Sequence, residues 1–280
     1  MGETIVVHKG HGLPYSKGLT AQELSATGLP LERSFELARV VERRLDEGGL
    51  AQIDVTELRS VCEAVLRDEE GETAVRRFRD WRRLDRLERP LVLMIGGTTG
   101  VGKSTLATML AARLGITRVI ATDVIRQVLR AFFTHEAMPS VHASAFEAGG
   151  VAGYRRQAGR VATGIEAIIR RAADEGKPLL VEGVHVVPGS LDDGLRDCCL
   201  PVEALVVVED EELHRGHFTL RRRRHRPERY LAHFEEIREL QEHLIACARE
   251  EGVRVIDNHN ADETLSVLMQ VVLDAVSEMA

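Results

Sequence analysis

The sequence predicts an α/β fold: a parallel sheet flanked by helices and preceded by a small α-rich domain. Beyond Pro90, short apolar segments alternate with segments of helical periodicity. One glycine-rich junction, which begins at Gly96, lies between an apolar segment and a helix. Before Leu87, most of the chain has helical periodicity instead. Because strands joined through helices run parallel and are covered on both faces, this alternation indicates a helix-flanked parallel sheet.

The expected elements follow the apolar pattern, in domains of residues 1–88 and 89–280. In the first domain, a strand at Thr4–His8 and a turn at 9–12 predict a hairpin whose second strand returns near Tyr15. The helices expected there are Ser34–Leu45, Asp54–Leu66 (with Asp54 as its N-cap) and Glu72–Leu87. The strands expected in the second domain are Leu91–Ile95, Arg118–Ala121, Leu179–Val181, Val202–Val208 and Val253–Ile256. Its expected helices are Ser104–Leu114, Val124–Phe133, Val161–Ala173 and Tyr230–Glu250.

Composition limits the class of protein and its partners. With 280 residues, 44% hydrophobic and 29% charged, the chain has the composition of a soluble globular protein. Lys and Arg number 37 against 44 Asp and Glu, a formal charge of -7, which argues against a nucleic-acid partner. No run approaches the ~18 apolar residues of a membrane span, and no signal segment is recognisable. We therefore expect a cytoplasmic protein with reduced cysteines and no membrane partner, either a monomer or a homo-oligomer.

The glycine-rich junction matches the phosphate-binding motif G-x-x-x-x-G-K-[ST] at Gly97–Ser104. Its backbone amides and the start of the following helix are suited to bind nucleotide phosphates. Lys103 is expected to bind the β and γ oxygens, and the Ser104 hydroxyl is expected to bind Mg²⁺. The nucleotide-binding residues expected are Gly97, Thr98, Thr99, Gly100, Val101, Gly102, Lys103, Ser104 and Thr105. Because no guanine-recognition motif is present, ATP is the favoured nucleotide. The motif between strand and helix predicts a P-loop NTPase fold.

Asp123 follows the second expected strand, at the edge of the sheet where ligands bind. A carboxylate there is suited to accept the proton of an attacking hydroxyl. Arg126 and Arg130 lie one helical turn apart and are suited to clamp a carboxylate or phosphate of the acceptor. The alternative for Asp123 is that it only caps the helix that begins at Val124.

Glu182 ends the third expected strand, at the position of a Walker B carboxylate. With Ser104 it is expected to hold Mg²⁺, which keeps several of its waters. Gly183 leaves room for a substrate. His185 either binds an acidic substrate group or is a hydrogen-bonded histidine of the pocket wall. The expected substrate-binding set is Asp123, Arg126, Arg130, Glu182 and His185.

Four consecutive arginines, Arg221, Arg222, Arg223 and Arg224, precede the last expected helix. Their place predicts a lid that closes over ATP and neutralises the transferring phosphoryl group. A solvated run of charge is the alternative, and so is an RNA-binding patch, although no aromatic stacking platform accompanies the run. The acceptor-binding region is expected between the second and third strands, around His142–Arg160. Asp257 and Asn258 follow the last strand, where adenine often lies.

Four segments together resemble the 2-phosphoglycerate kinase family, over roughly residues 88–275. They are Ile95–Thr105, Ala121–Arg126, Val181–Gly189 (Val-Glu-Gly-Val-His-Val-Val-Pro-Gly) and Arg238–Gln241, with Glu211–His214 and the arginine run in addition. The resemblance implies that the ATP γ-phosphate is transferred to 2-phosphoglycerate, a small anionic substrate, giving 2,3-bisphosphoglycerate.

Residues 1–88 resemble an ATP-cone, a small nucleotide-binding regulatory module, through Ile5–Lys17 and the helices that follow. Such modules carry a basic pair near the first turn, where this chain has His8-Lys9 in place of Lys-Arg. The resemblance implies a regulatory nucleotide site. A docking or dimerising domain without nucleotide remains the alternative.

The interpretation that unites these features is an ATP-dependent phosphotransferase with Lys103, Asp123 and Arg126 as catalytic residues. Two alternatives remain open. One is a kinase of another small acid or of a nucleoside. The other is an ATP-sensing regulatory protein with little turnover.

Overall fold

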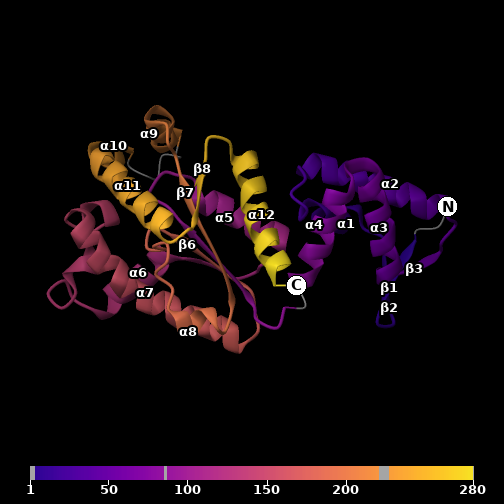
Figure 1. The fold of residues 1–280 in the computed structure, drawn as a ribbon, viewed down its shortest axis with the longest axis horizontal. Helices are drawn as coiled ribbons and strands as arrows, with labels where there is room; N and C mark the ends of the chain where they lie inside the picture. The colour runs from indigo at the N-terminus through magenta and orange to yellow at the C-terminus, as the bar shows by residue number, and fades with distance from the viewer. Residues whose placement is uncertain (1–3, 85–86, 221–226, 280) are drawn as a thin grey trace. The chain divides into compact units, whose positions relative to one another are not determined.

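The protein divides into two compact units in a computed structural model, which describes residues 4–84, 87–220 and 227–279. One unit contains Met1–Arg86 together with Val272–Ala280, and the other contains Leu87–Val271. From the sequence, the division is expected at residue 88, with the whole C-terminal segment in the second domain. The fold of each unit is drawn in Figure 1.

The N-terminal unit combines a three-stranded sheet with four helices. β1 (Ile5–His8) and β2 (His11–Pro14) form the expected antiparallel hairpin, and β3 (Gln52–Asp54) pairs parallel with β1. The helices are α1 (Lys17–Ser25), α2 (Leu31–Glu47), α3 (Val55–Glu70) and α4 (Glu72–Arg83). The second strand ends before Tyr15, because Ser16 caps α1 by accepting a hydrogen bond from the Leu19 amide.

The helices of this unit begin where local capping and apolar periodicity allow. Asp54 is the N-cap of α3 and forms a reciprocal capping box with Glu57, as its place before an apolar run predicts. Leu37 and Val41 of α2 and Phe78 of α4 are fully buried in a common core. The short sheet is therefore stabilised by the helices that pack beside it.

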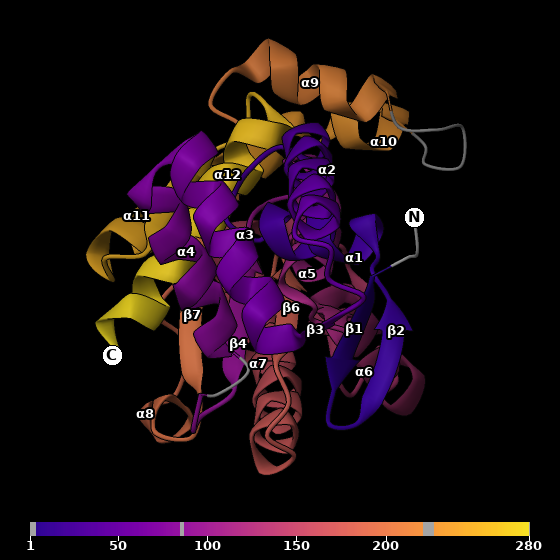
Figure 2. The same ribbon diagram turned by 90° about the vertical axis from the view of Figure 1, so that its right-hand side faces the viewer.

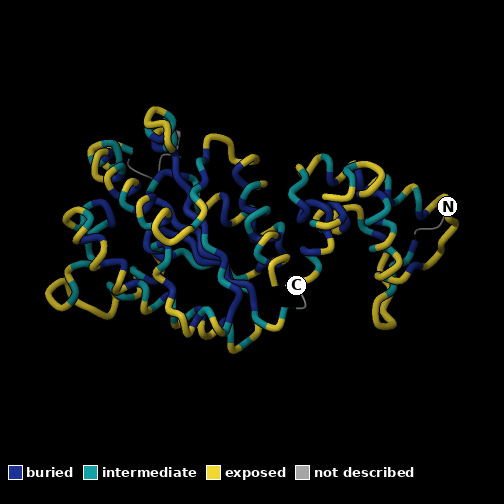
Figure 3. The backbone as a smooth tube through the Cα atoms, in the orientation of Figure 1, coloured by how far each residue is buried: buried dark blue, intermediate teal, exposed yellow. Residues whose placement is uncertain are grey.

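The second unit contains a five-stranded sheet of order β5-β6-β4-β7-β8 in which every pair is parallel. Its strands are β4 (Leu91–Gly96), β5 (Val119–Ala121), β6 (Leu179–Gly183), β7 (Leu200–Val207) and β8 (Arg254–Asp257). Every residue of β4 and β6 is buried, whereas the edge strands β5 and β8 are partly exposed (Figure 3). The predicted parallel sheet is confirmed.

Helices cover both faces of this sheet. The helices are α5 (Lys103–Leu114), α6 (Thr122–Phe132), α7 (Gly150–Asp174), α8 (Asp193–Arg196), α9 (Glu211–Leu220), α10 (Pro227–Ala232), α11 (Phe234–Glu250) and α12 (Ala261–Glu278). Only residues 261–271 of α12 belong to this unit. Two short 3₁₀ turns, η2 (Pro139–His142) and η3 (Ala145–Glu147), precede α7. In Figure 1, α5 and α12 lie on the side of the sheet opposite to α7 and α11. No helix among the described residues is both long and apolar enough to cross a membrane.

Several helices of the second unit differ from the sequence-based expectation. α7 begins at Gly150 rather than Val161, because burial of Tyr154 and Ala158 outweighs the weak helix propensity of its glycines. The long helix expected at Tyr230–Glu250 is divided at His233, after which Phe234 packs into an aromatic cluster. α8, α9 and α12 are additional to the helices expected there. Figure 2 shows α9 and α10 side by side.

Candidate active site

The predicted phosphate-binding loop connects the central strand β4 to α5. α5 begins at Lys103, directly after Gly102, so its positive end lies at the last residues of the loop. The Lys103 ammonium donates to the Thr98 carbonyl oxygen at 3.2 Å, which places it over the loop. The segment therefore has the strand, loop and helix arrangement that binds phosphates in P-loop proteins.

The carboxyl ends of β4, β5 and β6 meet at this loop. Ile95 pairs with Glu182, and Glu182 pairs in turn with Ala121 of β5. Thr122 and Asp123 follow Ala121 immediately, in the first turn of α6. The parallel register thus brings Glu182 and the segment before Asp123 to the edge of the sheet that carries the P-loop.

Glu182 and Ser104 are in direct contact. The Ser104 hydroxyl donates to Glu182 Oε1 at 3.0 Å. Glu182 is buried, and its Oε2 atom has no hydrogen-bond partner among the described residues. A buried carboxylate oxygen without a partner, beside a hydroxyl, fits a Mg²⁺ ion that arrives with the nucleotide. No cluster of three His, Cys, Asp or Glu in the described part of the chain forms a metal cage, and nucleotide-borne Mg²⁺ needs only one or two protein ligands.

Asp123 is open to a ligand, whereas Arg126 is largely buried. Their side chains are 67% and 11% exposed, and Arg126 Nε donates to Asp123 Oδ1 at 3.1 Å. Arg126 Nη1 also donates to the carbonyls of Val141 and Ala143, at 3.3 and 3.0 Å. The N-cap position of α6 is Ala121, so Asp123 does not act as its cap. Arg126 therefore orients Asp123 and holds the η2 loop.

A buried hydrogen-bonded chain runs from α6 to the η2 loop through His185. Its Nδ1 lies 3.0 Å from Thr122 Oγ1, and its Nε2 lies 3.0 Å from Gln157 Oε1. Gln157 Nε2 in turn donates to the carbonyls of Ser140 and Ala143, at 2.5 and 3.0 Å. Both ring nitrogens of His185 are thus engaged with protein groups. In this arrangement His185 is a hydrogen-bonded histidine of the pocket wall.

Burial sets the charge of His185. It lowers the pKa of the ring to about 4, and the positive charges of Arg126 and Lys103 act in the same direction while Asp123 opposes them. The ring is therefore neutral near pH 7. The neutral ring has one N–H and one bare nitrogen, which suits a chain that joins a hydroxyl to an amide oxygen.

Gly183 is required where β6 ends. Its φ of +149° is one that side chains rarely adopt, and a Cβ there would lie 1.9 Å from Thr122 Oγ1. The absence of a side chain lets Thr122 approach His185. The sequence indicated that Gly183 makes room, and the room is taken by Thr122.

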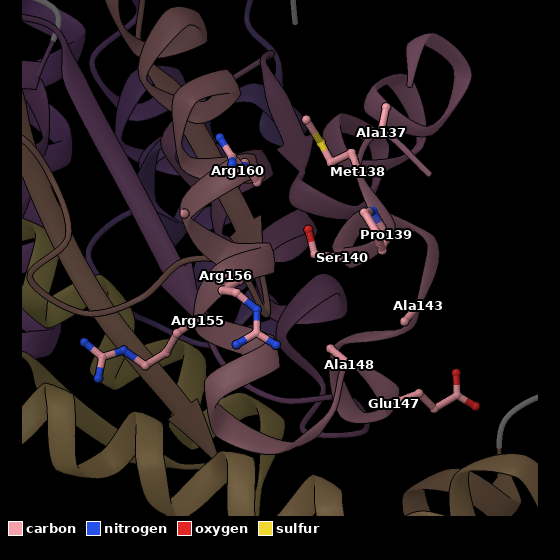
Figure 4. A pocket seen from close by; sticks show the side chains of 11 residues that line it. Ala137, Met138, Pro139, Ser140, Ala143, Glu147, Ala148, Arg155, Arg156 and Arg160 are labelled. Carbon is pink, nitrogen blue, oxygen red and sulfur yellow. The ribbon is translucent and has the colours of Figure 1, made fainter. Parts of the chain in front are cut away.

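A pocket of about 720 Å³ opens in the expected acceptor-binding region. Figure 4 shows it between α7 and the η2–η3 segment, with Arg156 directed toward it and Arg155 directed away, and Arg160 also lines it. Ser140 and Ala143, whose carbonyls Gln157 holds, are part of its wall. The pocket therefore adjoins the His185 chain and has a basic lining.

The segment after the predicted lid is tied to the same region. Arg229 of α10 pairs with Glu147 and donates to Ser144 Oγ at 2.8 Å. This pairing lowers the pKa of Glu147 below its usual range. The predicted lid residues Arg221, Arg222, Arg223 and Arg224 lie outside the described residues. Arg130 lies one turn beyond Arg126 on α6 and is partly buried.

Four polar residues of the site are not among the expected catalytic and binding residues, although the sequence places one of them, Asn258, near adenine. Gln157 was not predicted because the sequence indicates a helix that begins at Val161, four residues after it. His214, His217 and Asn258 each donate to a carbonyl of the P-loop, at 2.9 Å in every case. Two features of the sequence could have indicated these contacts: His214 lies in the Glu211–His214 segment, and Asn258 follows the last strand.

Comparison with known proteins identifies relatives along nearly the whole chain. The chain is 34% identical over 280 residues to a 2-phosphoglycerate kinase of Pyrococcus furiosus, with 95% of this chain and 92% of that protein covered. It is 34% identical over 282 residues to that of Methanopyrus kandleri, with 95% and 86% covered. It is 35% identical over 288 residues to that of Pyrococcus horikoshii, with 98% and 95% covered.

Among solved structures, similarity covers part of the chain and is distant. A shikimate kinase from Acinetobacter baumannii in complex with shikimate is 18% identical, with 70% of this chain and 97% of that chain covered and a TM-score of 0.40. A gluconokinase from Sinorhizobium meliloti is 18% identical, with 69% and 95% covered and a TM-score of 0.39. No protein-family model matches the chain. The identity to the three full-length relatives shows that the chain belongs to the 2-phosphoglycerate kinase family.

Proposed function

We propose that this protein is an ATP-dependent kinase that transfers the γ-phosphate to the hydroxyl of 2-phosphoglycerate, giving 2,3-bisphosphoglycerate. The observation that carries the proposal is the meeting of the P-loop with Glu182 and the Asp123 segment at one edge of the sheet. A carboxylate on the acceptor side is what a phosphotransferase needs in addition to a nucleotide site. Relatives that bear the name 2-phosphoglycerate kinase support the acceptor.

The P-loop would supply the charge stabilisation. Its amides and Lys103 bind the nucleotide phosphates and offset the negative charge that develops on the transferring group. Ser104 and Glu182 would hold Mg²⁺, which when bound neutralises the β and γ oxygens. These groups act by position and charge, and none forms a covalent bond to the phosphoryl group.

Asp123 would act on the acceptor. Its exposed carboxylate accepts the proton of the attacking hydroxyl, while Arg126 holds it in place through the bond at 3.1 Å. The anionic groups of the acceptor would bind in the basic pocket, where Arg156 and Arg160 are suited to bidentate contacts with phosphate and carboxylate. Arg130 remains a further candidate on the same side.

An ADP-release assay over small acids tests this function. The matched pair is 2-phosphoglycerate and 3-phosphoglycerate, because the two isomers have equal charge and differ only in which hydroxyl is free. We expect release with the first and none with the second. Slow release at the same rate with every acceptor would instead favour the ATP-sensing alternative.

We also propose that the N-terminal unit is an ATP-cone-like regulatory or docking module. The hairpin followed by helices supports this, and the hairpin turn carries His8-Lys9 where such modules have Lys-Arg. Equilibrium dialysis of ATP with Lys103→Ala tests it, since the kinase site is then weakened. Residual binding that a His8→Ala, Lys9→Ala variant removes is expected for a nucleotide site. Loss of all binding in Lys103→Ala would leave only a docking role.

The proposed setting is cytoplasmic. All four cysteines, Cys62, Cys198, Cys199 and Cys247, are free thiols. Burial raises the pKa of Cys199 to about 11 and that of Cys62 to about 12, which keeps both thiols protonated and unreactive. Thiols of this kind persist in a reducing compartment.

A further inference from the structure

Four consecutive carbonyl groups of the P-loop, those of residues 98–101, accept hydrogen bonds from side chains. The bonds are Lys103 Nζ to Thr98 at 3.2 Å, His214 Nε2 to Thr99 at 2.9 Å, His217 Nδ1 to Gly100 at 2.9 Å and Asn258 Nδ2 to Val101 at 2.9 Å. A carbonyl oxygen can only accept, so each of the two histidine nitrogens named here bears a proton. Three of the four donors come from segments more than 100 residues away, on α9 and after β8.

Holding a carbonyl also fixes the amide on the other side of the same peptide bond. The peptide unit is planar and trans, so the C=O of one residue and the N–H of the next point in opposite directions. Bonds to the carbonyls of Thr99, Gly100 and Val101 therefore direct the N–H groups of Gly100, Val101 and Gly102 to the opposite side. Those amides are the groups that a P-loop uses to bind phosphate.

α9 is held against the loop by aromatic packing. The Phe218 ring stacks on His214 with centroids 5.3 Å apart and on Tyr230 of α10 at the same separation. A Cβ on Gly100 would lie 2.5 Å from Phe218 Cζ, and the φ of Gly100 is +95°. The absence of a side chain at Gly100 thus lets α9 approach closely enough for its two histidines to reach the carbonyls.

We propose that His214, His217 and Asn258 form a carbonyl clamp that pre-orients the P-loop amides for the nucleotide phosphates. These are positioning residues, since they act through the loop and not on the reacting atoms. A preformed loop spares the nucleotide the cost of ordering it, so the clamp increases affinity for ATP. The inference deepens the proposed function and rests on it, because it assumes that this loop binds nucleotide.

The clamp makes the loop depend on the position of α9, which carries both His214 and His217. Displacement of α9 would move two of the donors away from the loop. The amide orientation is therefore coupled to the position of α9.

His217 provides the sharpest test, because it is only partly buried and bonds through Nδ1. The amide nitrogen of Asn lies at nearly the same place as Nδ1, whereas that of Gln extends further. His217→Asn should therefore keep the hydrogen bond to the Gly100 carbonyl. His217→Gln should lose this bond, although its side chain carries the same amide group as Asn. His217→Leu removes the donor altogether. Thr219→Ala is the matched control on α9, since the Thr219 hydroxyl donates only to Gly216 of its own helix.

The readout is the dissociation constant of the non-hydrolysable analogue AMP-PNP in the full-length protein, with the acceptor KM and a thermal melt measured beside it. We expect His217→Leu and His217→Gln to weaken AMP-PNP binding by about tenfold, the effect of one hydrogen bond. His217→Asn and Thr219→Ala should bind within about threefold of wild type. The acceptor KM should stay unchanged in all four variants.

Two outcomes would overturn the clamp. One is AMP-PNP binding by His217→Leu and His217→Gln as tight as that of wild type. The other is an equal loss in His217→Asn and His217→Gln, which would assign the effect to ring packing. If His217→Leu unfolds at a lower temperature than wild type, the comparison of AMP-PNP binding by His217→Asn and His217→Gln still tests the clamp. Wild-type protein that fails to bind AMP-PNP would overturn the proposed function, whereas wild-type binding with unaffected variants overturns the clamp alone.

Discussion

The proposed nucleotide side and the proposed acceptor side of the sheet edge are built differently. The P-loop is one continuous stretch, Gly97–Ser104, whose phosphate-binding groups belong mainly to the backbone. The acceptor side is assembled from segments far apart in the sequence, and Gln157 joins His185 to the η2 loop. Phosphate binding by backbone amides is therefore encoded locally, whereas recognition of a small acid depends on how distant segments pack.

The same difference explains which charged side chains remain available to ligands. On the acceptor side, Arg126 is bonded to Asp123 and to loop carbonyls, and both nitrogens of His185 have partners. Arg126 and His185 therefore hold other groups of the site in position through these hydrogen bonds. Substitutions on the nucleotide side should therefore reduce turnover with every acceptor, and substitutions in the basic pocket should affect acceptor binding alone.

The largest effect is expected for Lys103→Ala, which removes the cation that we propose stabilises the transferring phosphoryl group. We expect kcat to fall by about 1000-fold or more with any acceptor. Steady-state ADP release measures it. Lys177→Ala is the control, since Lys177 is exposed near the opposite end of β6. Wild-type turnover in Lys103→Ala would show that this loop is not the catalytic one.

A smaller effect is expected for Glu182→Gln. The amide can still accept from Ser104, but it loses the charge that the buried Oε2 atom offers to Mg²⁺. We expect kcat to fall by about 100-fold at saturating ATP, with a shift to higher Mg²⁺ requirement. A Mg²⁺ titration of the initial rate measures both. Exposed Glu239→Gln should behave as wild type, and a Glu182→Gln curve that overlies it would remove Glu182 from the metal site.

The acceptor side is tested by Arg156→Ala and Arg160→Ala. Each removes one guanidinium from the 720 Å³ pocket. We expect the acceptor KM to rise by about tenfold and the ATP KM to stay unchanged, because a charged hydrogen bond to the acceptor is lost. Arg171→Ala, further along α7 and paired with Glu175, is the control. A rise in the ATP KM instead would place the pocket on the nucleotide side.

The smallest effect concerns pH and the buried chain. Burial lowers the pKa of His185 from 6.5 to about 4. Between those values the unfolded chain binds a proton that the folded chain does not, so stability is complete above pH 6.5 and declines toward pH 4. Wild type should lose up to ~1.4 kcal/mol more unfolding free energy per pH unit than His185→Gln in this window. Urea unfolding at several pH values measures it, and parallel curves for the two proteins would show that His185 titrates normally.

The sheet could be predicted from the sequence because its strands are short, apolar and separated by helices. The expected Leu91–Ile95 and the observed Leu91–Gly96 nearly coincide, since each residue of a doubly covered strand is buried. The predicted start of α7 was wrong for two reasons. Glycines have low helix propensity, and the burial of Tyr154 cannot be inferred from the local pattern of apolar residues. β3 was missed because three residues carry too little pattern.

The site was predictable to the extent that it is local. The P-loop and the strand-end carboxylates were found, because motif and register place them. Gln157, His217 and Asn258 were not in the predicted set, since their contacts join residues distant in sequence. The hydrogen bonds from Arg126 to the carbonyls of the η2 loop could not be predicted for the same reason.

Transfer of label from [γ-³²P]ATP to 2-phosphoglycerate tests the central claim most directly. The wild-type protein is incubated with labelled ATP, Mg²⁺ and either 2-phosphoglycerate or 3-phosphoglycerate, and the products are separated by anion exchange. We expect label in a bisphosphorylated acid with the 2-isomer alone, and no transfer in Lys103→Ala. Label that appears only as inorganic phosphate, or equally with both isomers, would contradict it.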